Sequence, residues 1–187
     1  MLNECILKDF PVAPILSITP DLEPSVPRWY AAYTWSRHEK SVAKQLAERR
    51  VNSFLPLYRS WHRWKDRRQQ VELPLFPSYV FVHMTLAERV RVLELPGVVA
   101  LVTFQGQPAA LPTEEIETLR RGLEQEVYAE PHPYLRVGHK VRMRSGPLAG
   151  TEGILINKKE GLRMVISLEV LMRSIAVEVD AADVAAA

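Results

Sequence analysis

The sequence predicts an α+β protein built from two parts. The first is an N-terminal α/β sandwich, in which helices flank an antiparallel sheet, and the second is a small C-terminal β-barrel of five strands. Two long stretches repeat apolar residues at helical spacing, and the runs between them are rich in aromatic and β-branched residues. Residues 136–187 instead form short alternating runs interrupted by glycine, a pattern typical of a small barrel.

The chain divides where its composition changes. Residues 1–26 contain prolines every few positions, which predicts an extended, mobile leader because proline removes a backbone donor and blocks helix formation. Residues 27–128 carry the predicted sandwich and residues 136–187 the predicted barrel. Between them, residues 129–135 contain two prolines and are interpreted as a linker.

Composition limits the classes of function. The single cysteine, Cys5, excludes an internal disulfide framework and leaves no thiolate cluster for a zinc site. No apolar run approaches the roughly 20 residues that span a membrane, and acidic residues near the N-terminus make it a poor signal peptide. The five histidines lack metal-ligand spacing, and the sequence has no catalytic or nucleotide-binding motif. We therefore expect a cytoplasmic protein that is not an enzyme and has no cofactor or metal.

The sandwich begins with an aromatic strand, residues 28–35. Ser36 and Glu39 then form a capping-box pattern, which predicts that a helix starts here. Three basic residues fall on the side of this helix opposite its aliphatic residues: Arg37, Lys40 and Lys44. The helix is expected to bury one side and to present a basic stripe on the other.

Three segments follow this helix. Residues 52–64 predict a second strand that leads to a basic hairpin tip at residues 65–68, and residues 71–84 predict a third strand. A short helix is expected next, with Val90 and Leu93 facing inward.

An apolar strand and a second long helix complete the sandwich. The strand lies within residues 98–112, and Thr113 is expected to cap the helix. Apolar residues repeat along this helix at helical spacing: Ile116, Leu119, Leu123 and Val127.

Charge is unevenly distributed. The net charge is only +2, but residues 26–72 contain eleven Lys/Arg and four Asp/Glu. A local excess of basic charge favours contact with a phosphate backbone. The alternative is a solvated basic face without a partner.

Motifs in both parts resemble one family. The stretch "RVGHKVRMRSGPLAGTEGILI" resembles the KOW motif, with turn glycines Gly138, Gly146, Gly150 and Gly153. In the N-terminal part, "WYAAYTWSRHEKSVAKQL", "FLP", "LFPSYVFV" and "LPGVVALV" follow one another as in the NGN domain of the NusG transcription factors. The chain is most similar to the specialised paralogues of the RfaH, UpxY and LoaP types. The resemblance implies an NGN domain followed by an SH3-like KOW barrel.

The resemblance implies a polymerase-binding surface on the aromatic side of the sheet. In this family that side docks onto the clamp helices of the RNA polymerase β′ subunit. The matching residues are Tyr33, Phe76, Pro77, Tyr79 and Phe81. The residues alone leave a second interpretation open, in which both sides of the third strand are buried. If the docking interpretation holds, a charged residue at position 81 should abolish polymerase binding and leave the fold largely intact.

Contact with the non-template DNA strand of the transcription bubble is also implied. The candidate residues are Arg37, His38, Lys40, Lys44, Arg63, Trp64, Arg67 and Arg68. Tryptophans interleaved with basic residues can stack on unpaired bases. The alternative is a solvated basic hairpin with one tryptophan packed inward.

Further partners follow from the resemblance. Residues 88–92 correspond to a contact with the polymerase β-subunit gate loop, although this chain has arginines where RfaH is rich in threonine. The KOW domain is expected to recruit a small-subunit ribosomal protein or a termination factor. The protein is expected to act as a monomer and to suppress pausing or termination on a particular operon. Residues 162–179 are rich in Val and Ile, so we expect strands rather than the helical hairpin that RfaH can form there.

A ribosome-associated RNA-binding KOW protein is the alternative function. It predicts salt-dependent binding to structured RNA without polymerase. Residues 136–187 contain eight Lys/Arg and six Asp/Glu, a balance that argues against phosphate-driven binding by the barrel.

Overall fold

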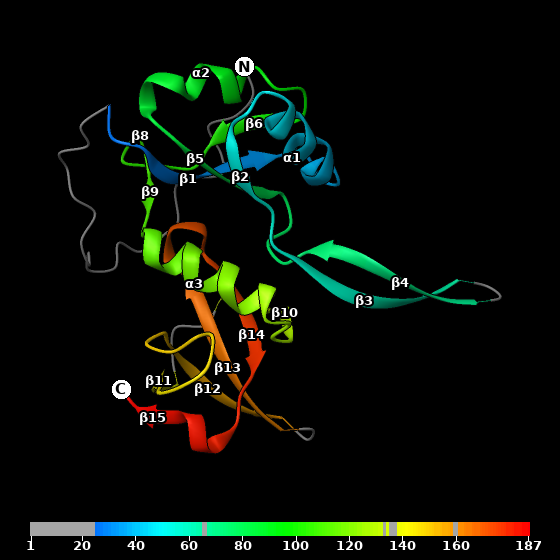
Figure 1. Cartoon of the computed structure of the whole chain (residues 1–187), viewed down its shortest axis with the longest axis vertical. Helices are drawn as coiled ribbons and strands as arrows, with labels where there is room; N and C mark the ends of the chain where they lie inside the picture. Colours follow the sequence, from blue (N-terminus) through cyan, green and yellow to red (C-terminus); the bar gives the residue numbers. More distant parts are fainter. Residues whose placement is uncertain (1–24, 65–66, 133, 135–137, 159–160) are drawn as a thin grey trace.

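The described part of the protein contains two large antiparallel sheets with a long helix between them, and two hairpins that form small sheets of their own (Figure 1). The computed structural model describes residues 25–64, 67–132, 134, 138–158 and 161–187. The predicted leader therefore lies almost wholly outside the described residues.

The N-terminal part of the chain is an antiparallel sheet with helices packed on it, as the sequence predicts. Its strands are β2 (Asn52–Phe54), β5 (Tyr79–Met84), β1 (Arg28–Thr34) and β6 (Val98–Leu101) in this spatial order, with β9 (Ala110–Leu111) also paired to β1. All these pairs are antiparallel, and Tyr33 lies opposite Tyr79 while Ala31 lies opposite Phe81. Because side chains alternate along a strand, Tyr33, Tyr79 and Phe81 share one face of the sheet.

Two helices cover the opposite face. They are α1 (Glu39–Glu48) and α2 (Arg89–Leu93), which a short 3-10 turn, η1 (Leu86–Glu88), precedes. Val42 and Leu46 of α1 are fully buried against Val80 and Val82 of β5. Burial of each such side chain contributes about 1.5–3 kcal/mol, so this apolar layer holds α1 on the sheet.

The predicted start of α1 is wrong in its details. The residue before the helix is His38, and no side chain caps its first turn. Arg37 adopts a positive φ of 66°, which places Ser36 outside the helix. Glu39 is buried instead, and its carboxylate accepts a hydrogen bond of 2.8 Å from the backbone N–H of Ser78. Glu39 therefore joins α1 to a distant turn and does not complete a capping box.

The predicted inward face of α2 is also wrong. Val90 and Leu93 are 52% and 40% exposed, whereas Val92 and Leu95 are buried. The chain enters α2 through η1, where Thr85 and Glu88 form a capping box. This 3-10 entry sets the rotation of a helix only five residues long, so helical periodicity alone could not identify its inner side.

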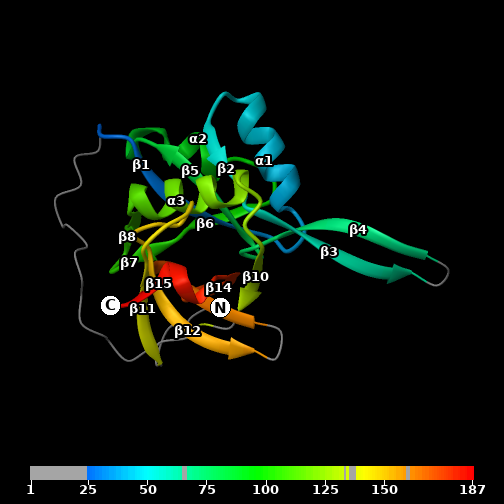
Figure 2. The same cartoon turned by 60° about the horizontal axis from the view of Figure 1, so that its bottom comes forward.

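The predicted second and third strands are each divided into two by a segment that contains a proline, Pro56 in the second strand and Pro77 in the third. β2 stops before Pro56, and the chain continues as β3 (Leu57–Trp64), which pairs with β4 (Arg67–Pro74) in a hairpin. A turn with Ser78 at a φ of 69° then separates β4 from β5. The β3–β4 hairpin projects away from the rest of the protein in both views (Figures 1 and 2). A second, minute hairpin is formed by β7 (Thr103–Phe104) and β8 (Gln107–Pro108).

Helix α3 (Thr113–Glu124) lies between the two sheets (Figure 1). Pro112, and not Thr113, occupies the position before the helix, and no side chain caps it. Ile116 and Leu119 are buried, as the apolar spacing predicts. One continuous cluster of buried apolar residues joins the N-terminal sheet, α3 and the C-terminal sheet.

The C-terminal sheet contains the five expected strands and one more. Its order is β10 (Ala129–His132), β14 (Arg173–Glu178), β13 (Gly161–Leu168), β12 (Glu152–Lys158), β11 (His139–Met143) and β15 (Val184–Ala186), with 3-10 turns η2 (Glu169–Leu171) and η3 (Ala181–Asp183). Residues 129–132, predicted as linker, instead pair with β14 as an edge strand. Proline is tolerated at an edge because its missing donor can face away from the ladder, and Pro131 lies opposite Ile175. The region 162–179 is mainly strand, as its Val and Ile content predicts.

Glycines shape the turn between β11 and β12. Gly146 and Gly150 have φ values of 81° and 86°, and Gly138 before β11 has a φ of 152°. Gly153 has no positive φ, but a Cβ there would lie 2.6 Å from the carbonyl oxygen of Val165. A side chain at Gly153 would therefore push β12 away from β13.

Candidate functional site

Aromatic side chains gather on the face of the N-terminal sheet that points toward α3. We call this set the aromatic face; its members are Trp29, Tyr33, Phe54, Phe76, Tyr79 and Phe81. The ring centroids of Tyr33 and Tyr79 lie 5.5 Å apart, and those of Phe76 and Phe81 lie 5.6 Å apart. The Phe54 and Phe81 rings stack at 6.2 Å. These contacts come from β1, β2, β5 and the turn before β5.

Most of the aromatic face is covered. Phe76 and Phe81 are 1% and 0% exposed, so the expectation of an exposed patch is wrong at these two positions. The guanidinium of Arg120 in α3 lies about 5 Å from the Trp29 and Phe54 rings, a favourable cation–π arrangement. Phe76 also borders a cavity of about 650 Å³ between α3 and the C-terminal sheet. The alternative interpretation, burial on both sides, therefore describes this part of the strand.

One end of the aromatic face remains open. Tyr33 is 43% exposed, Tyr79 is half-buried and Pro77 is exposed. The structure thus separates the five predicted docking residues into an open group of three and a buried pair.

Glu39 positions this open end, a role that its sequence pattern did not indicate. Its carboxylate binds the Ser78 N–H, and the Ser78 carbonyl accepts a 2.8 Å hydrogen bond from the Thr34 N–H. A hydrogen bond to a charged group contributes about 1.5–3 kcal/mol. The turn that holds Pro77 and Tyr79 is therefore fixed to the start of α1, which carries the basic residues.

The predicted basic residues of the α1 region lie together beside this end. Arg37, His38, Lys40 and Lys44 are all exposed. Trp35, which was not among the predicted contact residues, is 63% exposed, and its ring meets the His38 ring edge-on at 5.8 Å. An exposed aromatic ring among basic side chains can stack on a base while the cations contact phosphate.

The β3–β4 hairpin carries the other basic candidates. Its register places Arg63 opposite Arg68 and Trp64 opposite Arg67. Their side chains, and the whole of residues 65–66, lie outside what the structure describes. The backbone alone shows that these four positions are close together near the tip of a projecting hairpin.

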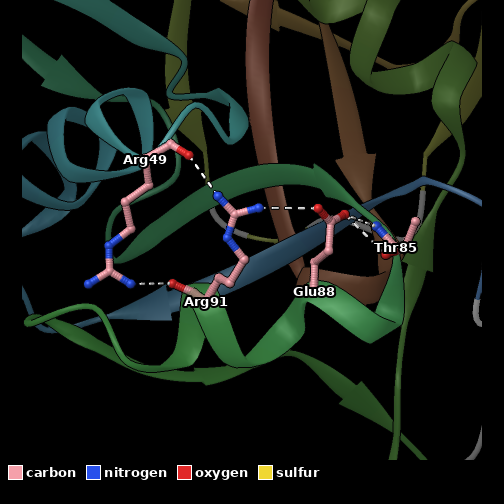
Figure 3. A network of polar contacts seen from close by, with 4 residues as sticks. All are labelled: Arg49, Thr85, Glu88 and Arg91. Atoms are coloured by element: carbon pink, nitrogen blue, oxygen red, sulfur yellow. Dashed lines mark hydrogen bonds and ion pairs between the residues drawn. The ribbon is translucent and has the colours of Figure 1, made fainter.

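Within residues 88–92, Glu88 and Arg91 form a network of polar contacts with Thr85 and Arg49 (Figure 3). The Glu88 carboxylate accepts hydrogen bonds from the backbone N–H and the hydroxyl of Thr85, at 3.1 and 3.0 Å. These bonds, the backbone one first, and the nearby Arg91 guanidinium lower the pKa of Glu88 below its ordinary value. Arg91 also reaches the carbonyl oxygen of Arg49 after α1. The arginine at 91 thus serves the packing of α1 against α2.

The contact between α3 and the C-terminal sheet is close. A Cβ at Gly122 would lie 2.7 Å from the Leu148 Cδ2. Across the same boundary, partial burial and the negative charge of Glu169 raise the pKa of Glu115 above its ordinary value. Glycine at 122 lets the helix and the turn before β12 touch directly.

The described residues contain neither a metal-binding cluster nor a helix that could span a membrane. No three His, Cys, Asp or Glu side chains within them lie close enough to hold a metal ion. No helix in the described part of the chain is long and apolar enough to cross a membrane.

Comparison with known families decides the assignment. The profile of the family described as "Transcription termination factor nusG" matches residues 27–120, which is half of the chain. The chain belongs to the NusG family. This family consists of transcription factors, and its match covers β1 through most of α3, the region that holds the aromatic face and the basic residues of α1.

Individual NusG proteins are similar over most of their length. The chain is 26% identical over 167 residues to "Transcription termination/antitermination protein NusG" of Rickettsia felis, covering 81% of this chain and 87% of the relative. It is 27% identical over 171 residues to the protein of the same name from Staphylococcus aureus, covering 82% and 92%. A solved structure titled "Domain interaction in Thermotoga maritima NusG" superimposes with a TM-score of 0.57 at 23% identity, covering 86% of this chain and 97% of that one. This last likeness supports the fold.

Proposed function

We propose that this NusG-family protein binds RNA polymerase during elongation and suppresses pausing or termination, on a particular operon. The observation that carries the proposal is the open end of the aromatic face, where the Tyr33 and Tyr79 rings pack against each other beside the exposed basic residues at the start of α1. An apolar contact next to a basic surface suits a protein partner that itself holds nucleic acid. The termination/antitermination names of the relatives agree with this role.

The polymerase contact is proposed at the β′ clamp helices. Tyr33, Pro77 and Tyr79 are available as the structure stands, and Tyr side chains are frequent anchors of protein interfaces. Phe76 borders the cavity under the C-terminal sheet, so its use would require that sheet to separate from α3. Part of the binding free energy then offsets the cost of separating the C-terminal sheet from α3. The apparent affinity for polymerase is therefore lower when a larger fraction of molecules is in the closed form.

Nucleic-acid contact is proposed for two surfaces. Arg37, His38, Lys40 and Lys44 form the first, and the hairpin positions Arg63, Trp64, Arg67 and Arg68 form the second. The non-template DNA strand is the proposed ligand, since single-stranded bases can stack on aromatic rings. The C-terminal sheet would recruit a small-subunit ribosomal protein or a termination factor, and residues 88–92 would approach the β gate loop. We propose that the protein acts in the cytoplasm as a monomer.

Polymerase binding with a matched pair of variants tests this proposal. Core RNA polymerase is immobilised and the affinity of the full-length protein is measured at moderate salt. Tyr79→Asp should weaken binding at least about 30-fold, because truncating an interface anchor costs about 2 kcal/mol or more. Phe104→Asp, which places the same charge on another exposed aromatic position, should leave the affinity unchanged.

Two outcomes would contradict the proposal. Equal affinities for wild type and Tyr79→Asp would show that the open end is not the contact. Absence of polymerase binding together with tight, salt-dependent binding to structured RNA would favour the ribosome-associated alternative.

A further inference from the structure

A groove lies where the base of the β3–β4 hairpin meets the chain leaving α3. Its volume is about 850 Å³. One wall comes from β3 and β4, and the other from the end of α3, the following loop and β10. We call it the hairpin groove. It is distinct from the aromatic face and from the basic residues of α1.

Acidic side chains dominate the charge of the hairpin groove. Among the described residues that line it, one is an arginine, Arg59, and four are glutamates: Glu72, Glu124, Glu126 and Glu130. This is the reverse of the basic character of residues 26–72 as a whole. Phosphate groups would be repelled here, and cations attracted.

Two of these carboxylates lie at the C-terminal end of α3, where a negative charge destabilises the helix. Glu124 is the last residue of α3 and Glu126 follows two positions later. The C-terminal end of a helix carries a partial negative charge, so acidic residues there are unfavourable. Glu126 also has a φ of 57°, a conformation in which glycine or asparagine is usual. Departures from local preference of this kind are expected where a residue serves binding.

Aromatic rings provide the apolar part of the walls. Trp61 of β3 is 69% exposed and Tyr128 of the loop is 48% exposed. The hydroxyl of the half-buried Tyr58 has a raised pKa, because of burial first and then of nearby Tyr128 and Glu130. Large exposed rings beside carboxylates match the chemistry of a guanidinium, which stacks on a ring and binds carboxylates in its plane.

The wall of the groove already binds one guanidinium in this way. Arg163 of β13 is buried, and its Cζ lies 5.6 Å from the centre of the Tyr128 ring. Its nitrogens form ion pairs with Glu130 and, at 3.1 Å, with Glu178. Tyr128 and Glu130 thus hold an arginine of this chain from within and also line the groove.

We propose that the hairpin groove binds an arginine-rich segment of a partner protein. The carboxylates at the end of α3 supply the charge complementarity, and Trp61 and Tyr128 supply surfaces for stacking. Nucleic acid does not fit this lining because of its charge, and an apolar peptide would leave the carboxylates desolvated without a counter-ion. The proposal is independent of polymerase binding.

Fluorescence anisotropy with a labelled peptide tests the proposal on the full-length protein. The probe is a short peptide of alternating arginine and alanine, and its control has citrulline, a neutral isostere, at every arginine. The arginine peptide should bind at least about tenfold more tightly, and the difference should shrink as salt is added. The double variant Glu124→Gln/Glu126→Gln should weaken binding about tenfold, and Trp61→Ala about threefold to fivefold. Glu48→Gln/Glu94→Gln removes the same charge from exposed positions on α1 and after α2, and should leave the affinity unchanged.

Several results would overturn the proposal. Equal binding of the arginine and citrulline peptides would show that charge does not drive binding. Equal losses of affinity in the two double variants would show that binding depends on the net charge of the protein and not on the hairpin groove. A single-stranded oligonucleotide whose affinity falls with Trp61→Ala would assign the groove to nucleic acid. Self-association in ultracentrifugation that Glu124→Gln/Glu126→Gln abolishes would assign it to the basic hairpin of a second copy.

Discussion

Arg49 and Arg91 each donate a hydrogen bond to the other's backbone carbonyl, at 3.0 and 2.9 Å. Arg49 is the residue that ends α1, so the Arg91 guanidinium binds the negative end of the α1 dipole. The pair joins two helices that lie on the same face of the N-terminal sheet (Figure 3). This packing role accounts for the presence of Arg91 in α2, and it requires no binding partner.

Loss of Arg91 should therefore loosen α1 from α2. Arg91→Ala removes the bond to Arg49 and the 3.3 Å ion pair to Glu88, both partly exposed. We expect the free energy of unfolding in urea to fall by about 1 kcal/mol. Arg89→Ala is the control, because Arg89 donates its hydrogen bond to the nearby Leu86 carbonyl and not to another helix among the described residues; it should change stability by less than about 0.5 kcal/mol. Equal losses in the two variants would mean that the Arg49–Arg91 pair contributes nothing.

Glu88 should make this region sensitive to acid. Its pKa is lowered in the folded protein from an ordinary value of 4.5, chiefly by the Thr85 backbone N–H. A lowered carboxyl pKa contributes stability that is present above pH 4.5 and is lost as the pH falls through the folded value. The stability difference between wild type and Glu88→Gln should therefore be constant from pH 7 to 5 and shrink below 4.5. A difference that does not change with pH would show that the ionised carboxylate is not what stabilises the turn.

The sheet and helix pattern followed from residue periodicity, whereas the exposure of particular side chains did not. Alternation along β5 correctly places Val80 and Val82 on one face and Phe81 on the other. The alternation cannot predict what packs on each face of the sheet. The face that contains Phe81 is covered by α3 and the C-terminal sheet, which lie far along the chain. Phe81 is 0% exposed, so a charged residue there would disrupt the core, and the expectation of an intact fold is wrong.

The cap of α1 and the strand at 129–132 were missed for similar reasons. Glu39 matches a local capping pattern, but a backbone N–H at Ser78 is available to it only after the sheet has formed. Prolines near residue 131 are typical of a linker, yet an edge strand accepts them. In each case a tertiary contact replaced the local preference.

Two arginines of the C-terminal sheet should differ in their contribution to stability. Arg163 is buried between Glu130, Glu178 and the Tyr128 ring, whereas Arg142 pairs with Glu152 in a largely exposed position. Arg163→Ala should lower the free energy of unfolding by about 3 kcal/mol, since it removes a buried cation from its carboxylates. Arg142→Ala should lower it by less than about 1 kcal/mol. Urea unfolding of both variants measures the difference, and similar values would show that burial of Arg163 does not strengthen its contacts.

A disulfide between α3 and the C-terminal sheet should block the proposed use of Phe76. Gly122 and Leu148 are in direct contact, so Gly122→Cys/Leu148→Cys in a Cys5→Ser background places two thiols close together. If polymerase binding requires the sheet to separate from α3, the oxidised form should bind at least about tenfold more weakly than the reduced form. The control is the single variant Leu148→Cys, which keeps Gly122 and should be insensitive to oxidation. Equal binding of both redox forms would restrict the polymerase contact to the open end at Tyr33 and Tyr79.

The boundary between α3 and the C-terminal sheet should also be weakened by charge at neutral pH. Glu115 in the first turn of α3 faces the negative charge of Glu169, and its pKa is raised by partial burial first and by this charge second. A raised carboxyl pKa means that ionisation is unfavourable in the folded form, so stability is present below pH 4.5 and is lost as the pH rises through the folded pKa. Glu115→Gln should therefore raise the free energy of unfolding at pH 7, by only about 0.5 kcal/mol because part of the side chain remains open to solvent, which screens its charge.

Glu114→Gln is the matched control for this effect. Glu114 lies in the same first turn and interacts with the same helix dipole, so its loss should slightly destabilise the protein. The gain from Glu115→Gln should disappear as the pH falls, because the wild-type carboxyl is then protonated. Glu169→Gln should give a similar gain, and the double variant less than the sum, since either change removes the same repulsion. Additive gains would mean that Glu115 and Glu169 do not interact across the boundary.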